Sequence, residues 1–177
     1  MNDIPWVFPR ETPNRDDRYM GLAIMHAAFS KDPRTQMGAV IITADNIPRG
    51  AGYNGPSRRL NDSEINWSRE SGKNDLIAHA EENAIDFSNG PLEGCTIYVT
   101  GFPCRSCMEL LGRRGIKRIV YLERNYDTGS MQASLDNFKR SMEIASLFKM
   151  DVEVYKGDLS WIPNWLEKLK QDNILHI

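Results

Sequence analysis

The fold is decided by residues 96–107, which read TIYVTGFPCRSC. Residues 96–100 are β-branched or aromatic, a composition that is typical of a strand. The strand leads through a short turn into a Cys-x-x-Cys pair, Cys104 and Cys107, at which we expect a helix to begin. The N-terminus of a helix carries a positive partial charge, which favours the thiolate form that binds metal. The stretch therefore predicts a strand, a turn and a helix that together present two metal ligands.

A third metal ligand lies upstream, in the tripeptide His79-Ala80-Glu81. One imidazole and two thiolates make three protein ligands, the number with which a catalytic zinc leaves its fourth tetrahedral position to water. A closed structural site would need four ligands. Glu81 lies two residues after His79, close enough to exchange protons with that water without holding the ion. We therefore predict one Zn²⁺ per chain, bound by His79, Cys104 and Cys107, with Glu81 as the catalytic residue.

Length and composition bound what such a site can serve. The chain has 177 residues, of which 41% are hydrophobic, so we expect one domain, with an irregular N-terminal arm at 1–12 and a tail helix within 157–177. A net charge of −2 does not provide the positive surface potential that nucleic-acid binding requires, and it favours a small-molecule substrate. Two of the three cysteines form the Cys-x-x-Cys pair, which indicates metal and a reducing compartment. Because no apolar run approaches the roughly 18 residues of a membrane span and the start lacks a signal-peptide core, we expect a cytoplasmic protein with no membrane partner.

The first elements are predicted to be a helix and a hairpin. Thr12 is expected to cap the helix, with Pro13 at its first position. The apolar stripe of this helix consists of Tyr19, Leu22, Ala23, His26 and Phe29. We expect His26, on this stripe, to be buried and hydrogen-bonded rather than to bind metal. Residues 37–43 and 47–53 predict the two strands of the hairpin. The glycines of residues 50–56 (GAGYNGP) either form the turn at its end or let a ligand approach the backbone closely.

The second half of the chain alternates between helix and strand patterns. Residues 57–74 are polar and lack periodicity, which indicates a binding loop or lid, with disorder as the alternative. Residues 76–87 predict a helix that carries His79 and Glu81 near its start. Strands at 118–122 and 152–155, joined by a helix at 131–148, imply a right-handed parallel crossover. The inward side of that last helix is expected to consist of Leu135, Phe138, Met142, Ala145 and Phe148.

Five motifs resemble the zinc-dependent cytidine and deoxycytidylate deaminase superfamily, and within it most closely the deoxycytidylate (dCMP) deaminases. They are Ser30-Lys31-Asp32-Pro33 leading to Gly38-Ala39-Val40, then Gly52-Tyr53-Asn54-Gly55-Pro56, residues 79–85 (HAEENAI), Tyr98-Val99-Thr100, and residues 103–107 (PCRSC). The resemblance covers residues 18–155. It implies an α/β protein with the three-layer α/β/α cytidine-deaminase-like fold, in which helices flank a five-stranded mixed sheet in the order 2-1-3-4-5.

The resemblance also implies a reaction and its regulation. It implies hydrolytic deamination of dCMP to dUMP and ammonia, which supplies dUMP for thymidylate synthesis, with Glu81 as the proton shuttle. Members of the family are commonly homohexamers that dCTP activates and dTTP inhibits, and Mg²⁺ could accompany a bound triphosphate. Some relatives hold a second zinc. Here only Cys95, His26 and His176 remain for one, so we predict a single zinc.

Substrate and effector contacts follow partly from the resemblance and partly from residue chemistry. The expected substrate-binding residues are Asn54 at the ribose, the backbone N–H of Ala80 at the base, Phe102 packed on the base, Pro103, Arg105 and Tyr126. Lys31 and Arg34 are further candidates for the phosphate. Arginine and glycine-rich backbone suit phosphate oxygens, so an effector site at a subunit interface is expected at Ser30, Lys31, Arg34, Asn54, Gly55, Arg58, Arg59 and Asn61.

Other functions stay open at this stage. The chain could deaminate dCTP or another cytosine nucleotide. A tRNA or free-base deaminase shares the zinc residues, but a tRNA enzyme would carry more basic charge. A structural zinc module without catalysis would need a fourth ligand, and the sequence offers none at suitable spacing. The 57–74 segment could also close over the substrate, in which case Arg58 and Arg59 would act on substrate affinity and not on regulation.

Overall fold

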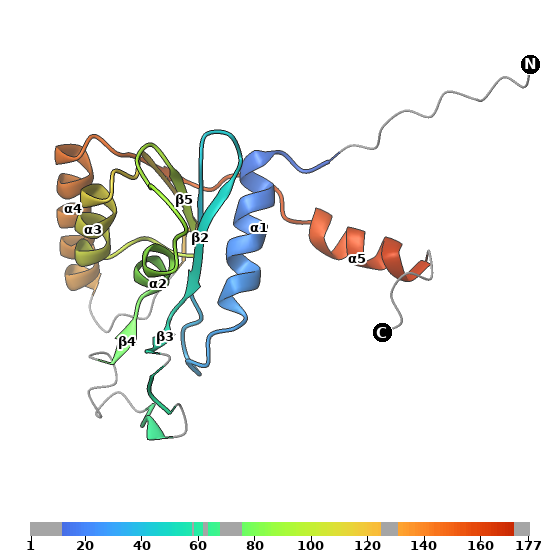
Figure 1. Ribbon diagram of the computed structural model, residues 1–177, viewed down its shortest axis with the longest axis horizontal. Helices are drawn as coiled ribbons and strands as arrows, with labels where there is room; N and C mark the ends of the chain where they lie inside the picture. Colours follow the sequence, from blue (N-terminus) through green and yellow to red (C-terminus); the bar gives the residue numbers. More distant parts are fainter. Residues whose placement is uncertain (1–11, 58, 62–63, 68–75, 125–130, 172–177) are drawn as a thin grey trace, which may run out of the picture.

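The computed structural model describes residues 12–57, 59–61, 64–67, 76–124 and 131–171 (Figure 1). The predicted N-terminal arm at 1–12 falls outside this part of the chain except for its last residue, and so do Arg58, Tyr126 and His176. Among the described residues, no helix is both long enough and apolar enough to span a membrane.

A five-stranded mixed sheet forms the centre of the molecule. Its strands are β1 (Gly38–Ile42), β2 (Pro48–Tyr53), β5 (Thr96–Val99), β6 (Arg118–Tyr121) and β7 (Asp151–Val154), in the order β2-β1-β5-β6-β7. Strand β1 pairs antiparallel with β2 and β5, whereas β5, β6 and β7 are parallel. The predicted order 2-1-3-4-5 is therefore confirmed, and so are the hairpin and the parallel crossover.

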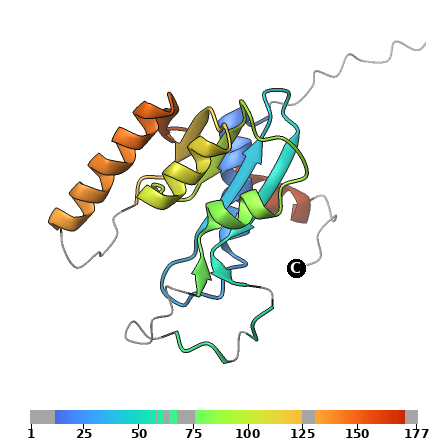
Figure 2. The ribbon, with the colours of Figure 1, turned by 60° about the vertical axis from the view of Figure 1, so that its left-hand side comes forward.

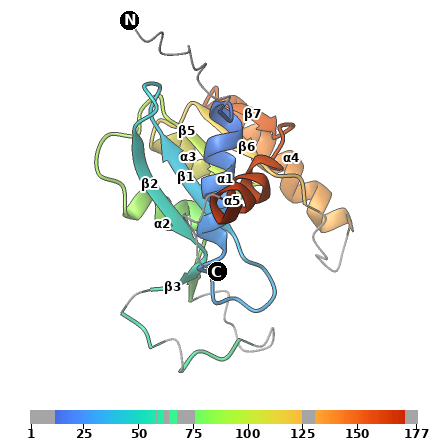
Figure 3. The same ribbon diagram turned by 90° about the vertical axis from the view of Figure 1, so that its right-hand side faces the viewer.

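Helices cover both faces of this sheet. Figure 2 shows α2 (Ala80–Asp86), α3 (Arg105–Arg113) and α4 (Met131–Leu147) on one face, and Figure 3 shows α1 (Arg15–Ala27) on the other, beside α5 (Trp161–Gln171). Strand β1 is buried on both sides, because Ala39 and Ile41 belong to the core beneath α2 and α3 while Val40 and Ile42 pack with α1. The molecule thus has the predicted three-layer α/β/α architecture.

The first helix begins later than predicted. Asn14 and not Thr12 is its N-cap, because the Asn14 side chain accepts a hydrogen bond of 2.9 Å from the Asp17 N–H. The predicted apolar stripe is also partly wrong: Tyr19 and Ala23 are buried, but Leu22 and Phe29 are 38% and 63% exposed. His26 is half-buried against the Phe29 ring instead of being enclosed in the core. The face that meets the sheet is instead completed by Met20 and Ala27, which are buried.

The helix predicted over residues 76–87 is shorter in the structure, because its first residues form a strand. Strand β4 (Ile77–Ala78) pairs antiparallel with β3 (Gly55–Pro56) in a second, two-stranded sheet, and α2 starts only at Ala80. Two glycines bring this helix close to β2. A methyl group on Gly50 would overlap the Ala84 carbonyl, and one on Gly52 would overlap the backbone of Ala80 and Ala84. These glycines serve helix packing, which neither interpretation of the glycine-rich stretch included.

The inward side of α4 differs from the prediction as well. Ala145 is buried as expected, but Leu135, Phe138 and Phe148 are each more than 40% exposed. Ser141, which the apolar pattern left out, is fully buried. Small side chains at Ser141 and Ala145 suit the close packing of α4 beside α3. The tail helix α5 meets α1 through Trp161 and Ile162, whose side chains lie over Gly21.

Candidate active site

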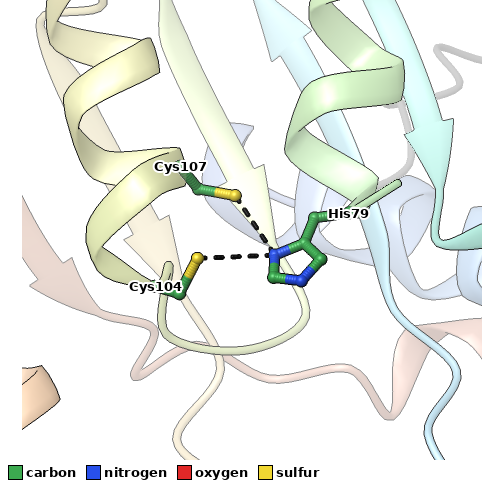
Figure 4. A group of neighbouring side chains, drawn as sticks. All are labelled: His79, Cys104 and Cys107. Atoms are coloured by element: carbon green, nitrogen blue, oxygen red, sulfur yellow. Dashed lines mark hydrogen bonds between the residues drawn. The ribbon is translucent and has the colours of Figure 1, made fainter. Parts of the chain in front are cut away.

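Two segments, the junction of β4 with α2 and the start of α3, bring the predicted metal ligands together. His79 lies between β4 and α2, where it is the N-cap residue of α2, and Cys104 is the N-cap residue of α3. Cys107 follows in the first turn of α3. Figure 4 shows the imidazole facing both sulfurs: His79 Nδ1 lies 3.4 Å from Cys104 Sγ and 3.3 Å from Cys107 Sγ. All three ligand atoms lie within 4.8 Å of one another.

This donor set fits zinc. Zn–N and Zn–S bonds of about 2.1 and 2.3 Å in a tetrahedron separate nitrogen and sulfur by roughly 3.6 Å, close to the observed spacing. Two sulfurs and one imidazole nitrogen are also the ligand types that zinc prefers among the divalent metals. Cys107 is buried, Cys104 is half-buried and His79 is exposed, so the site is open on one side. Three ligands and an open side are characteristic of a catalytic metal site.

Hydrogen bonds among the three ligand side chains shift the pKa of each of them. Hydrogen bonds from Cys107 and His79 hold the pKa of the Cys104 thiol at about 3, which makes it a thiolate. The hydrogen bond to Cys104 raises the pKa of His79 to about 9. The same bond to Cys104, together with burial, raises the pKa of the Cys107 thiol far above its ordinary value. Metal binding replaces these shared protons, because zinc takes thiolate and neutral imidazole as ligands.

Glu81 lies beside the ligands in an apolar setting. It is only 4% exposed, in the first turn of α2. Burial raises the pKa of its carboxyl to about 7, although the positive charge of His79 opposes this rise. A group with a pKa near neutral can both accept and donate a proton. The burial and the raised pKa of Glu81 suit the predicted role of acid and base, which stays a prediction.

The family follows from this geometry and from comparison with known proteins. The family profile described as "Cytidine and deoxycytidylate deaminase zinc-binding region" matches residues 13–123. This chain belongs to the cytidine and deoxycytidylate deaminase family. As a member it carries that family's zinc-binding region, in which the His, Cys and Cys ligands lie.

Named relatives of this family agree with the assignment. Human "Deoxycytidylate deaminase" is 36% identical over 115 residues, which cover 61% of this chain and 64% of the relative. The protein of that name from Mycobacterium phage D29 is 36% identical over 122 residues, 62% of this chain and 94% of the relative. The chain thus spans slightly less than two thirds of its vertebrate relatives. A further similarity is to the crystal structure of a dCMP deaminase from the cyanophage S-TIM5 in complex with dCMP and dUMP, which is 20% identical in sequence. The two folds match over 82% of this chain and 100% of the cyanophage chain, with a TM-score of 0.65.

Four of the predicted substrate residues, Ala80, Phe102, Pro103 and Arg105, lie within two positions of a metal ligand in the sequence, and their burial differs. Ala80 and Pro103 are buried next to His79 and Cys104. Phe102 is half-buried, and its ring packs on the rings of Tyr121 and Phe138, with centroids 5.0 and 4.7 Å apart. Arg105 has an exposed side chain.

The side chain of Asn54, which was predicted to contact the ribose, is hydrogen-bonded within the protein. Its side-chain oxygen accepts a hydrogen bond of 2.8 Å from the Met37 N–H, and its Nδ2 donates one of 2.9 Å to the Thr35 carbonyl. The Ser30 hydroxyl also donates to the Asn54 carbonyl, at 2.8 Å. One amide hydrogen and one lone pair remain for a ligand. Asn54 therefore ties residues 30–37 to the end of β2, whatever else it binds.

The described residues among the predicted effector contacts differ in their surroundings. Lys31, Gly55 and Arg59 line a groove of about 1200 Å³ that also reaches His79 and Glu82. Ser30 and Asn54 do not line this groove and are joined by the hydrogen bond just described. The Arg34 backbone N–H donates to Asp32, and the Asn61 amide donates to Glu64. Within the described part of the chain, the groove and the metal site therefore meet at one ligand, His79.

Two polar residues next to the ligands were not predicted as part of the site. Glu82, expected to be a surface or polar-network residue, accepts a hydrogen bond of 2.6 Å from the His79 N–H. The Ser106 hydroxyl lies 3.1 Å from Cys104 Sγ. The spacing His79-x-x-Glu82 is that of an N-cap residue and its N3 partner, a signal from which the first contact could have been found.

Proposed function

We propose that this protein catalyses the zinc-dependent hydrolytic deamination of dCMP to dUMP and ammonia. The observation that carries the proposal is the convergence of three zinc ligands beside the buried carboxylate of Glu81. The substrate is inferred from relatives in this family that bear the name deoxycytidylate deaminase. We propose further that residues 1–177 act as one deaminase domain.

The chemistry assigns the proton transfers to Glu81. Zinc, when bound by His79, Cys104 and Cys107, supplies a nucleophile near neutral pH by lowering the pKa of a water molecule to about 7. Glu81 takes the proton that the water loses and delivers it to N3 of the cytosine ring, which makes C4 electrophilic. The water oxygen attacks C4. Glu81 then takes the proton of the new C4 hydroxyl and passes it to the amino group, which leaves as ammonia while the C4 carbonyl forms.

Regulation is the second part of the proposal. The groove beside the site offers the cations Lys31 and Arg59, which suit the phosphates of a nucleotide. We propose that dCTP activates and dTTP inhibits a homohexamer through this groove, with Mg²⁺ accompanying the bound triphosphate. Two effectors with different affinities for two quaternary states would act by population shift. The enzyme would then supply dUMP for thymidylate synthesis in the cytoplasm, without nucleic-acid or membrane partners.

The deaminase proposal is tested by ammonia release from dCMP, CMP, deoxycytidine, cytidine and dCTP. Fastest turnover with dCMP, abolished by a zinc chelator and restored by zinc, supports it. Higher kcat/KM with dCTP or with an unphosphorylated nucleoside would reassign the substrate. Absence of turnover on all five by the zinc-loaded protein would end the proposal.

The regulatory proposal has its own experiment. The double variant Arg58→Ala, Arg59→Ala should lose the response to dCTP and dTTP while keeping near-normal turnover at saturating dCMP. Arg140→Ala is the matched control, because this exposed arginine on α4 pairs with Glu143 and lies outside the groove. A raised KM for dCMP with intact triphosphate response would instead assign the arginines to the substrate, and a wild type that ignores both triphosphates would refute regulation.

A further inference from the structure

Glu82 touches the metal site at one point, the backbone of His79. Its Oε2 accepts a short hydrogen bond, of 2.6 Å, from the His79 N–H. Its neighbour Glu81 is buried, whereas Glu82 is half-buried and lines the groove. The two adjacent carboxylates therefore lie in different surroundings, and only Glu81 is enclosed in the protein beside the ligands.

The His79 carbonyl accepts a further hydrogen bond, of 3.1 Å, from the Asn83 N–H, but the elements on either side of His79 are short. Before it, β4 consists of only Ile77 and Ala78, and a two-stranded ladder of this size is marginally stable. After it, α2 has seven residues, too few for a helix that is stable by itself. The imidazole must nevertheless hold Nδ1 within 3.4 Å of two sulfurs that belong to another helix, α3. A small rotation of the backbone at His79 would carry the ring away from them.

We infer that Glu82 is a positioning residue for the metal ligand His79. Its carboxylate fixes the His79 N–H at the junction of β4 and α2, and so aims the imidazole at Cys104 and Cys107. Metal affinity thus depends on a side chain that does not bind the metal. The inference rests on the proposed zinc site and deepens it. Partners that orient zinc ligands typically change metal affinity about 10–100-fold when they are removed.

Three variants separate this role from its alternatives. Glu82→Ala removes the hydrogen bond and the charge, whereas Glu82→Gln removes the charge but keeps an oxygen that can accept the N–H. Asp86→Ala is the matched control, because it removes a carboxylate from the same helix and the same groove. The zinc dissociation constant is measured by competition with a chromophoric chelator, and the visible spectrum of the cobalt-substituted protein reports the ligand geometry.

The expected result is zinc affinity that falls about 10–100-fold in Glu82→Ala, with an altered cobalt spectrum, and affinity that is largely retained in Glu82→Gln and Asp86→Ala. Equal loss in Glu82→Gln and Glu82→Ala would overturn the inference, because charge and not the hydrogen bond would then carry the effect. Unchanged zinc affinity and cobalt spectrum in a less stable Glu82→Ala would also overturn it, since Glu82 would then be a helix cap alone. If the wild type itself binds no zinc, it is the proposed function that fails.

Discussion

Gly52→Ala should displace α2, the helix that carries Glu81. Gly52 lies in β2, and a Cβ there would overlap the Ala84 nitrogen and the Ala80 carbonyl oxygen of α2. Both contacts are with backbone, so no side-chain rotation can relieve them. Overpacking of this kind costs up to about 3 kcal/mol, and the lower entropy of the unfolded alanine chain offsets at most about 1 kcal/mol. We therefore expect the free energy of unfolding to fall by about 2 kcal/mol.

Urea unfolding of the zinc-loaded protein measures this change, and ammonia release measures its effect on Glu81. Gly55→Ala is the control, because a Cβ there meets only the Tyr53 ring, at 3.7 Å and 3.9 Å, which is ordinary contact. Stability of Gly52→Ala within about 0.5 kcal/mol of wild type would refute the packing argument, since that is the usual effect of a neutral substitution. So would equal losses in the two glycine variants.

Three further predictions test the site and the scaffold. Glu81→Gln should keep zinc and fold but lose turnover, because an amide cannot shuttle protons; ammonia release within about tenfold of wild type would remove Glu81 from its role. Cys104→Ala should lose most bound zinc, because two ligands rarely retain the ion, and full zinc content by atomic absorption would refute the ligand assignment. Hydrogen bonds from Arg118 hold the pKa of Asp16 below its ordinary 3.8, so their stabilisation is present above that pH and is lost as the pH falls through the lowered value. Arg118→Met should therefore lower the free energy of unfolding by at most about 1 kcal/mol at pH 7, since the ion pair is partly exposed. In urea titrations between about pH 2 and 6, the free energy of unfolding of this variant should fall less steeply with acid than that of the wild type. An unchanged dependence on pH would contradict this prediction.

The metal site could be predicted because its signals are local and strong. Cys104 and Cys107 follow a β-branched strand, so their spacing, their secondary structure and their chemistry all agree. The hairpin and the parallel strands likewise have clear alternation or apolar runs. The resemblance to a known family then supplied the order of the strands.

The features that could not be predicted depend on contacts between distant segments. Strand β4 has two residues, too few for any periodicity, and it exists because Gly55 and Pro56 pair with it. The buried face of α4 is set by its packing beside α3, so a helical wheel drawn from apolar residues placed Phe138 inward and left Ser141 out. Asn54 was expected at the ribose, but its side chain bonds to Met37 and Thr35, which lie 17 and 19 positions away in the sequence. Such bonds cannot be predicted before the fold brings these residues together.

The short ladder between β3 and β4 also bears on how this chain can change during evolution. Gly55 pairs with Ala78 and Pro56 with Ile77, so the two ends of the intervening segment lie side by side. The entropy of closing a loop grows slowly, by about 0.6 kcal/mol for each doubling of its length. Residues can therefore be gained or lost between Pro56 and Ile77 at little thermodynamic cost while His79 stays in register. New specificity or new regulation can be acquired in that segment without rebuilding the catalytic centre.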